Sequence, residues 1–336
     1  MMFCSFQLRR ATFGSVFGLM ACVFGGAAVA QTLPLPPADV DLVGQSQVIS
    51  ALYEDTMLDI ARRYHLGHDE IMIANPKVDK WLPGAGKPVT LPTRYILPDA
   101  ERTGLVLNVP EMRLYYFPQT KRGEPRVIET YPVSVGRMDW QTPLGKSHVA
   151  AKVKDPAWRP PKSIRAEAAA RGEILPEVVP PGPKNPLGQY ALRLSVPGYL
   201  IHGTDKPWGI GMRVTHGCMR LYPEDSEKIF RSVDVGTQMQ MVNQQVKVGW
   251  VDGVLYMEVH PPLEEDLVRQ NALMNMALDT LEKAFLKRRT AVSGRAIADA
   301  VEQQTGMPVA ISRNATIEAD ARPLDATQNG VMVVQP

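Results

Sequence analysis

The segment 199–221, YLIHGTDKPWGIGMRVTHGCMRL, contains the residue types that acyl transfer through a thiol requires. Cys218 is a candidate nucleophile, but a free thiol with a pKa of about 8.5 carries little thiolate at neutral pH. His202 ends an apolar run at 199–201 and is a candidate base that could accept the thiol proton. Gly217 lets the backbone turn sharply, so that successive N–H groups can converge on an oxyanion. The segment therefore predicts a strand that ends at the base and a turn that carries the nucleophile.

The same residues permit other interpretations. His202, His216 and Cys218 could bind zinc, although H-x-C is an unusual metal-site spacing and the nearby sequence offers no clear fourth ligand. The side chain of His216 could be purely structural, and Arg220 could be a buried ion-pair partner rather than a substrate contact. The remaining histidines are expected at the surface or on strands: His65, His68, His148 and His260.

Residues 1–30 have the pattern of an export signal. Arg9 and Arg10 precede an uncharged apolar segment that ends in the small-x-small sequence AVA. A transmembrane anchor, or a lipoprotein signal ending at Cys22, are the alternatives. Cleavage after residue 30 would remove Cys4 and Cys22 and leave Cys218 unpaired in a compartment where cysteines usually form disulfides. An unpaired exported thiol favours a catalytic over a structural role.

Composition excludes other classes of protein. Of 336 residues, 45% are apolar and 21% are charged, which allows a sizeable core and excludes a disordered polyelectrolyte. Removal of the signal takes away two of the 37 basic residues, and the remainder then equals the 35 acidic ones. A net charge near zero gives no support to a nucleic-acid partner.

Ahead of this chemistry lies a small module. Residues 31–45 are Pro-rich and predict a linker, and 46–92 predict a compact unit with the order strand, helix, helix, strand. Thr56 and Asp59 match a capping box at the start of the first helix. The segments DTMLDIARRY, IMIANP and LPGAGKPVTLP resemble the LysM module, which binds glycans rich in N-acetylglucosamine. Glu54 stands where that family usually has Gly, and a spacer without glycan affinity is the alternative.

Residues 104–245 predict a mainly β domain. Alternating apolar segments predict a hairpin around Pro110-Glu111 and further strands up to 242. A Pro-dense insertion at 155–186 contains one short helical stretch, IRAEAAAR, and long irregular insertions of this kind are typical of lids and binding loops. Asp252-Gly253 predicts a separate β-hairpin at 246–262. Residues 263–336 predict a helical extension of unknown role, with helices at 264–289 and 294–304.

The motif IHGT followed by THGCMRL closely resembles the signature of the L,D-transpeptidase family of bacterial cell-wall enzymes, which have a YkuD-like catalytic domain. The similarity covers about 104–242 and includes LVLNVPEMRLYYFP, VGRMDWQTPLG, AWRPP and VVPPGPKNPLGQYALRL. Thr215 stands where many members have Ser, and the segment beyond about 262 has no counterpart in this resemblance. The implied fold is a mainly β, sandwich-like catalytic domain of the YkuD type, with an α/β LysM-like module and a helical C-terminal extension.

The resemblance also implies roles for single residues. Cys218 would be the nucleophile, and His202 the base and later the proton donor. The carbonyl of Gly203 would orient the imidazole, and the backbone N–H groups of His216, Gly217 and Cys218 would bind the oxyanion. Two arginines would contact substrate carboxylates or brace the loop: Arg220 and Arg213.

The implied enzyme is a periplasmic L,D-transpeptidase that needs no cofactor or metal. Its donor would be a peptidoglycan stem tetrapeptide. Its acceptor would be the terminal Lys of an outer-membrane lipoprotein or the third residue of a second stem. An L,D-carboxypeptidase, a non-catalytic peptidoglycan-binding protein and a zinc-binding regulator are the alternatives. After signal cleavage no membrane span is expected.

Overall fold

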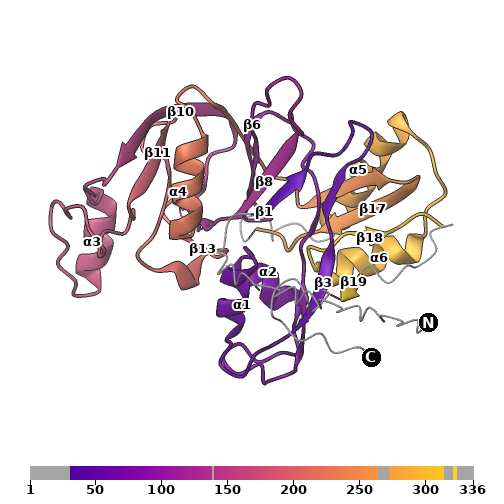
Figure 1. Cartoon of the computed structure of the whole chain (residues 1–336), viewed down its shortest axis with the longest axis horizontal. Helices are drawn as coiled ribbons and strands as arrows, with labels where there is room; N and C mark the ends of the chain where they lie inside the picture. The colour runs from indigo at the N-terminus through magenta and orange to yellow at the C-terminus, as the bar shows by residue number, and fades with distance from the viewer. Residues whose placement is uncertain (1–30, 138–139, 264–271, 314–320, 324–336) are drawn as a thin grey trace, which may run out of the picture.

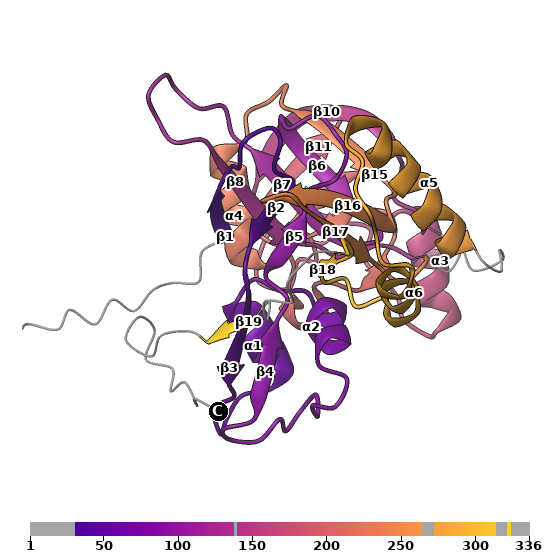
Figure 2. The same cartoon turned by 90° about the vertical axis from the view of Figure 1, so that its right-hand side faces the viewer.

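The computed structural model describes residues 31–137, 140–263, 272–313 and 321–323 (Figure 1). The expected export signal at 1–30 lies outside the described residues. The described chain forms a central sheet, a small N-terminal module on one side of it, and a C-terminal unit on another (Figures 1 and 2). No described helix is long and apolar enough to cross a bilayer.

The central sheet has nine strands in the order β1-β8-β7-β6-β15-β10-β11-β12-β14, with parallel pairing only at β6–β15 and β12–β14. Their bounds are β1 Gln31–Pro34, β6 Gly104–Asn108, β7 Arg113–Phe117, β8 Val127–Pro132, β10 Gly145–Lys154, β11 Tyr190–Leu194, β12 Leu200–His202, β14 Met219–Arg220 and β15 Gln238–Val242. One apolar core takes residues from both halves of the sheet and from α4 (Pro223–Ser232), among them Leu107, Leu114, Leu192, Ile201 and Ile229. The mainly β class is thereby confirmed.

The N-terminal module has the predicted order of elements. They are β3 (Ser46–Ser50), α1 (Met57–Arg63), α2 (His68–Ala74) and β4 (Pro88–Leu91). The two strands pair antiparallel, and β19 (Ala321–Pro323) adds a parallel strand on the other side of β3. Thr56 and Asp59 form the predicted capping box, and the helices bury Met57, Ile60 and Ile71 against the strands. The module therefore has its own small core.

Residues 31–45 are not a linker. Their first four residues form β1, which pairs with β8, and Leu42–Gly44 form β2, which pairs with β5 (Arg94–Ile96). Leu33 and Val43 pack in an apolar cluster with Tyr115 and Ile128 of the central sheet. Proline is compatible with β1 because this strand lies at the edge of the sheet, where unpaired N–H positions are tolerated.

The hairpin at 246–262 is not separate from the C-terminal extension. β16 (Val246–Val251) and β17 (Val254–Val259) form the predicted hairpin, and β18 (Val309–Ala310) extends it to a three-stranded sheet. The helices α5 (Ala272–Lys287) and α6 (Gly294–Gln303) share one apolar core with this sheet. Hairpin and helices are thus one unit, and the part of the long predicted helix at 264–271 lies outside the described residues.

The N-terminal module contacts the loop that leads to Cys218. The backbone N–H groups of His68 and Asp69 donate to the carbonyls of Ile210 and Gly211, at 2.8 and 3.2 Å. A Cβ on Gly211, where φ is +83°, would lie only 2.3 Å from the Cα of Gly67. On the neighbouring helix α4, Glu224 accepts two hydrogen bonds from Arg62 of α1. The α1–α2 pair therefore lies directly against the catalytic domain.

Candidate active site

The strands β12 and β14 bring the two catalytic candidates to one face. They pair in parallel, with Ile201 opposite Met219 and His202 opposite Arg220. Ile201 and Met219 are buried in the core. Because side chains alternate between the faces of a strand, His202, Cys218 and Arg220 lie on the opposite face. This places the imidazole and the thiol as diagonal neighbours on adjacent strands, in the same pocket.

The turn before β14 is held by side chains on both sides. Gly217 adopts a φ of +96°, and a Cβ there would lie 2.7 Å from the ring of Tyr199. The Thr215 hydroxyl donates to the carbonyl of Cys218 at 2.6 Å, and the Thr142 hydroxyl donates to that of Gly217 at 3.1 Å. The motif therefore needs glycine at 217 for both conformation and space.

His202 is 4% exposed, and its Nδ1 lies 2.6 Å from the carbonyl oxygen of Gly203. A carbonyl only accepts, so Nδ1 carries the hydrogen and Nε2 is left with a lone pair. Burial, and next the positive charge of Arg220, lower the pKa of His202 to about 3. The imidazole is therefore neutral at neutral pH, in the tautomer that can accept a proton.

Cys218 is half-buried, and its Sγ lies 3.7 Å from the carbonyl of Gly198. Burial raises the pKa of the Cys218 thiol, against the smaller opposing effects of the Leu200 backbone N–H and of Arg220. The resting site thus combines a neutral thiol with a neutral base. In such a pair the proton is transferred as the sulfur attacks, instead of being stored beforehand as a thiolate–imidazolium pair.

The pocket has a volume of about 720 Å³, and the 155–186 insertion forms one of its walls. The insertion is folded back on itself by a bridge between Trp158 and Val179, and it includes the helix α3 (Lys162–Ala170). The buried amide of Asn185 donates to the carbonyls of Pro156, Val179 and Pro180, which closes the base of the loop. The insertion residues that line the pocket are Pro156, Ala157, Trp158, Arg159, Pro161, Ser163, Ile164 and Pro186.

The two arginines of the motif occupy different places. Arg220 lines the Cys218 pocket, and its Nε is buried without a hydrogen-bond partner among the described residues. Arg213 lies on β13 (Arg213–Thr215), donates from Nε to the carbonyl of Gly136, and lines a second cavity of about 360 Å³. The geometry favours Arg220 over Arg213 as a group that could meet a substrate carboxylate.

His216 lines the Cys218 pocket, and its ring reaches the insertion. Its Nε2 lies 2.8 Å from Oε2 of Glu167 on α3, and its ring lies 5.3 Å from that of Trp140. Glu167 stands in the Ala- and Arg-rich helix of the insertion, where nothing in the sequence pattern marks it as a functional residue. With Nε2 bonded to Glu167, that nitrogen is not free to bind a metal together with Cys218.

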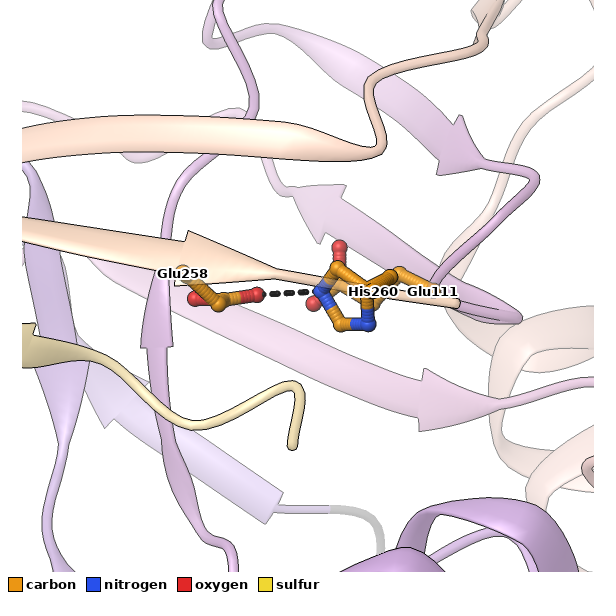
Figure 3. A group of neighbouring side chains, drawn as sticks. All are labelled: Glu111, Glu258 and His260. Atoms are coloured by element: carbon orange, nitrogen blue, oxygen red, sulfur yellow. Dashed lines mark hydrogen bonds and ion pairs between the residues drawn. The ribbon is translucent and has the colours of Figure 1, made fainter. Parts of the chain in front are cut away.

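The described residues contain one other group that could suggest a metal: Glu111, Glu258 and His260 (Figure 3). The ammonium of Lys247 lies 2.8 Å from Glu111 and 2.6 Å from Glu258, so a cation already balances the two buried carboxylates. His260, expected at the surface or on a strand, directly follows the strand β17 (Val254–Val259) and is buried, with its Nε2 2.6 Å from Glu258. This cluster joins the catalytic domain to the C-terminal unit.

His65 was also expected at the surface and is buried. It is 5% exposed, and its Nδ1 lies 3.2 Å from Oδ1 of the fully buried Asp225 on α4. The pair forms part of the contact between the N-terminal module and the catalytic domain. His148 is exposed on β10, as predicted.

Comparison with known proteins assigns most of the described chain to two families. The L,D-transpeptidase catalytic domain matches residues 102–248, and the L,D-transpeptidase C-terminal domain matches residues 250–311. The second match corrects the expectation that the segment beyond 262 has no counterpart. The chain is 37% identical to the probable L,D-transpeptidase YcfS of Escherichia coli K12 over 293 residues, which cover 85% of this chain and 90% of that protein. It is 38% identical to the probable L,D-transpeptidase YbiS of the same organism over 309 residues, which cover 90% and 98%.

Proposed function

Because this chain belongs to the YkuD family of L,D-transpeptidases, we propose that it is a cysteine transpeptidase acting on the peptide stems of peptidoglycan. The observation that carries the proposal is the shared pocket of Cys218 and His202, on one face of β12 and β14. The thiol is half-buried and the imidazole neutral, as general-base activation of a thiol requires. The export signal expected from the sequence is consistent with action in the periplasm, where the substrate lies.

The proposed reaction has two halves. Sγ of Cys218 attacks the carbonyl between the third stem residue and the terminal D-Ala, while Nε2 of His202 takes the thiol proton. The oxyanion of the tetrahedral intermediate is stabilised by the N–H groups at 216–218. His202 then returns the proton to the leaving amine, D-Ala departs, and the stem remains bound to Cys218 as a thioester. An acceptor amine then attacks the thioester, gives its proton to His202, and the thiol is restored.

Arg220 is the proposed partner of a donor carboxylate. Its guanidinium lies in the pocket beside the thiol, and burial lowers its pKa against the opposing charge of Asp205. A carboxylate of the stem would provide the charge and acceptor atoms that its buried Nε lacks. We propose the terminal Lys of a lipoprotein as the acyl acceptor, with the side-chain amine of a second stem next in order. Water as acceptor would make the enzyme an L,D-carboxypeptidase.

For the N-terminal module we propose glycan binding, as in the LysM modules it resembles. Its loops at 51–56 and 75–87 leave large apolar side chains exposed, and the backbone N–H of Met57, at the start of α1, donates to the carbonyl of Lys80 in the second loop. The exposed side chains are Leu52, Tyr53, Trp81 and Leu82. Apolar and aromatic surfaces of this kind suit the faces of sugar rings, and the module would hold the enzyme on the wall.

Intact-mass spectrometry of the mature protein with a disaccharide-tetrapeptide tests the catalytic proposal. Wild type should gain the mass of the substrate less D-Ala, and Cys218→Ala should gain none. Candidate amines added afterwards should discharge the adduct, and the one that does so fastest identifies the acceptor. If folded wild type forms no adduct, a wall-binding protein without catalysis becomes the better explanation. Glycan binding that persists in Cys218→Ala would then be expected.

A further inference from the structure

The insertion touches the nucleophile turn through one carboxylate. Glu167 of α3 accepts at Oε2 from Nε2 of His216, at 2.8 Å, and from Nη2 of Arg137, at 2.7 Å. Its Oε1 accepts from Arg171 one helical turn later, at 2.8 Å. Three donors thus converge on a single side chain, and one of them lies two residues before Cys218. No step of the proposed reaction uses this carboxylate.

We propose that Glu167 is a positioning residue that sets the oxyanion-binding turn for acylation by Cys218. The inference rests on the proposed transpeptidase function and extends it to a residue that does not itself line the Cys218 pocket but bonds to His216, which does. Glu167 acts through His216, whose backbone is one of the proposed oxyanion donors. Oxyanion stabilisation depends on donors held at the place where charge develops, so a small displacement of this turn is costly.

The ring of His216 is fixed from two sides. Glu167 bonds its Nε2, and the ring of Trp140 lies at 5.3 Å with an interplanar angle of 59°. The backbone N–H of Arg137 donates to the carbonyl of Thr215 at 3.1 Å, so the arginine that contacts Glu167 also holds the strand before the turn. The hydrogen bonds from His216, and next from Arg137, lower the pKa of Glu167 to about 2. The carboxylate is therefore ionised at neutral pH.

The same helix also meets the pocket. Ser163 and Ile164 line the Cys218 pocket, and they precede Glu167 by four and three residues. Residues at these spacings share one face of a helix. A peptide that fills the pocket therefore packs against the face of α3 that carries the contact to His216. Helix α3 therefore links the binding of a donor peptide in the pocket to the geometry of the turn that binds the oxyanion.

Two reactions of Cys218 separate this role from others. Acylation by a tetrapeptide needs nucleophile, base and oxyanion donors, whereas alkylation by iodoacetamide needs no oxyanion donors. Glu167→Ala should slow single-turnover acylation by on the order of tenfold or more, and leave the alkylation rate within about twofold of wild type. Glu167→Gln keeps an acceptor oxygen at the same position and should recover part of the loss.

Glu177→Ala is the matched control. Glu177 lies in the same insertion, its side chain is 89% exposed, and its ion pair with Arg165 is long, at 3.8 Å. This variant should acylate and alkylate like wild type. In a double-mutant cycle, the variant with both Glu167→Ala and His216→Gln should acylate only slightly more slowly than either single variant, because the two side chains act as one unit.

The outcomes distinguish this inference from the proposed function. If wild type forms no acyl-enzyme, the proposed function fails. If wild type acylates and Glu167→Ala acylates at the same rate, only the positioning role fails. Equal losses of acylation and alkylation would also overturn it, because they would indicate general disruption of the site. Hydrogen exchange of the peptide 190–202 in each variant reports whether the central sheet is still folded.

Discussion

The neutral imidazole of His202 has a consequence for stability that can be measured. In the folded protein its pKa is about 3, against an ordinary value of 6.5. As the pH falls below 6.5, the unfolded chain takes up a proton at this position and the folded chain does not. The unfolded state then binds more protons, so the free energy of unfolding decreases as the pH falls, until the pH reaches the folded pKa.

The size of the effect follows from the two pKa values. Between pH 8 and pH 5, His202 alone should lower the free energy of unfolding by about 2 kcal/mol. This figure hardly depends on how far below pH 5 the folded pKa lies, because the folded imidazole is neutral at both pH values. Replacement by Asn removes the titrating group and keeps an N–H that can donate to the carbonyl of Gly203.

The assay is hydrogen exchange of the β11 and β12 amides at pH 8 and pH 5, corrected for intrinsic exchange rates. It reports the opening of this sheet and not of the whole chain, which has several units. On acidification from pH 8 to pH 5, the free energy of opening should decrease by about 2 kcal/mol more in wild type than in His202→Asn. His148→Asn, at an exposed histidine on β10, should behave like wild type. Equal pH dependence of wild type and His202→Asn would refute a neutral, buried His202.

Three further predictions concern the turn, the buried charge cluster and the thiol. Gly217→Ala should destabilise the protein by about 1–3 kcal/mol and abolish acylation, because φ is +96° and the new Cβ would meet the Tyr199 ring. Thermal unfolding measures the stability, and intact-mass spectrometry measures the acylation. Gly209→Ala, with nothing within 4 Å of its Cβ position, should change neither property. Lys247→Met should cost about 3–5 kcal/mol in denaturant unfolding, because it leaves two buried carboxylates without their cation; an unchanged midpoint would contradict the ionic cluster. Alkylation of Cys218 by iodoacetamide should be slow at pH 7 and still rise above the ordinary thiol pKa, since burial raises the pKa of this thiol; a rate that levels off below pH 7 would contradict it.

Local patterns in the sequence predict much of the fold. Asp252-Gly253 between two apolar segments is sufficient to predict the hairpin of β16 and β17, and Thr56 with Asp59 predicts the start of α1. Cys218 and His202 could be predicted as a reacting pair because their residue types and neighbours suit the chemistry, and the structure places them in one pocket. Their approach to each other depends on the pairing of β12 with β14, which the sequence does not specify by itself.

Long-range contacts account for the errors. Residues 31–34 resemble the start of a linker because Pro34, Pro36 and Pro37 lie close together, and they become a strand only by pairing with 127–130, about a hundred residues away. Their own sequence contains no sign of that partner. His65 is buried for the same reason, since its partner Asp225 belongs to α4, far along the chain. Burial of a polar residue depends on partners that the local pattern does not contain.

The position of Glu167 at the active site also could not be predicted from the sequence. In the sequence it is one acidic residue in an Ala- and Arg-rich helix, where a solvated surface position is the ordinary expectation. Only the fold of the insertion brings it to His216, 49 residues later in the chain. The motif around Cys218 indicates candidates for the reacting residues but not the residues that hold them in place.

The contact between Gly67 and Gly211 limits how this protein can be rebuilt. A side chain at either position would collide with the backbone of the other, at 2.9 Å from Gly67 and 2.3 Å from Gly211. The N-terminal module therefore cannot be replaced by any similar module. A replacement must have a residue without a side chain at the position of Gly67, where the loop containing Gly211 contacts it. Chimaeras that exchange the module between relatives should succeed only when both glycines, and the amides beside them, are transferred as a matched pair of surfaces. A chimaera with its boundary near residue 93 would combine a Gly67 surface and a Gly211 surface from different proteins, and these two surfaces must be complementary.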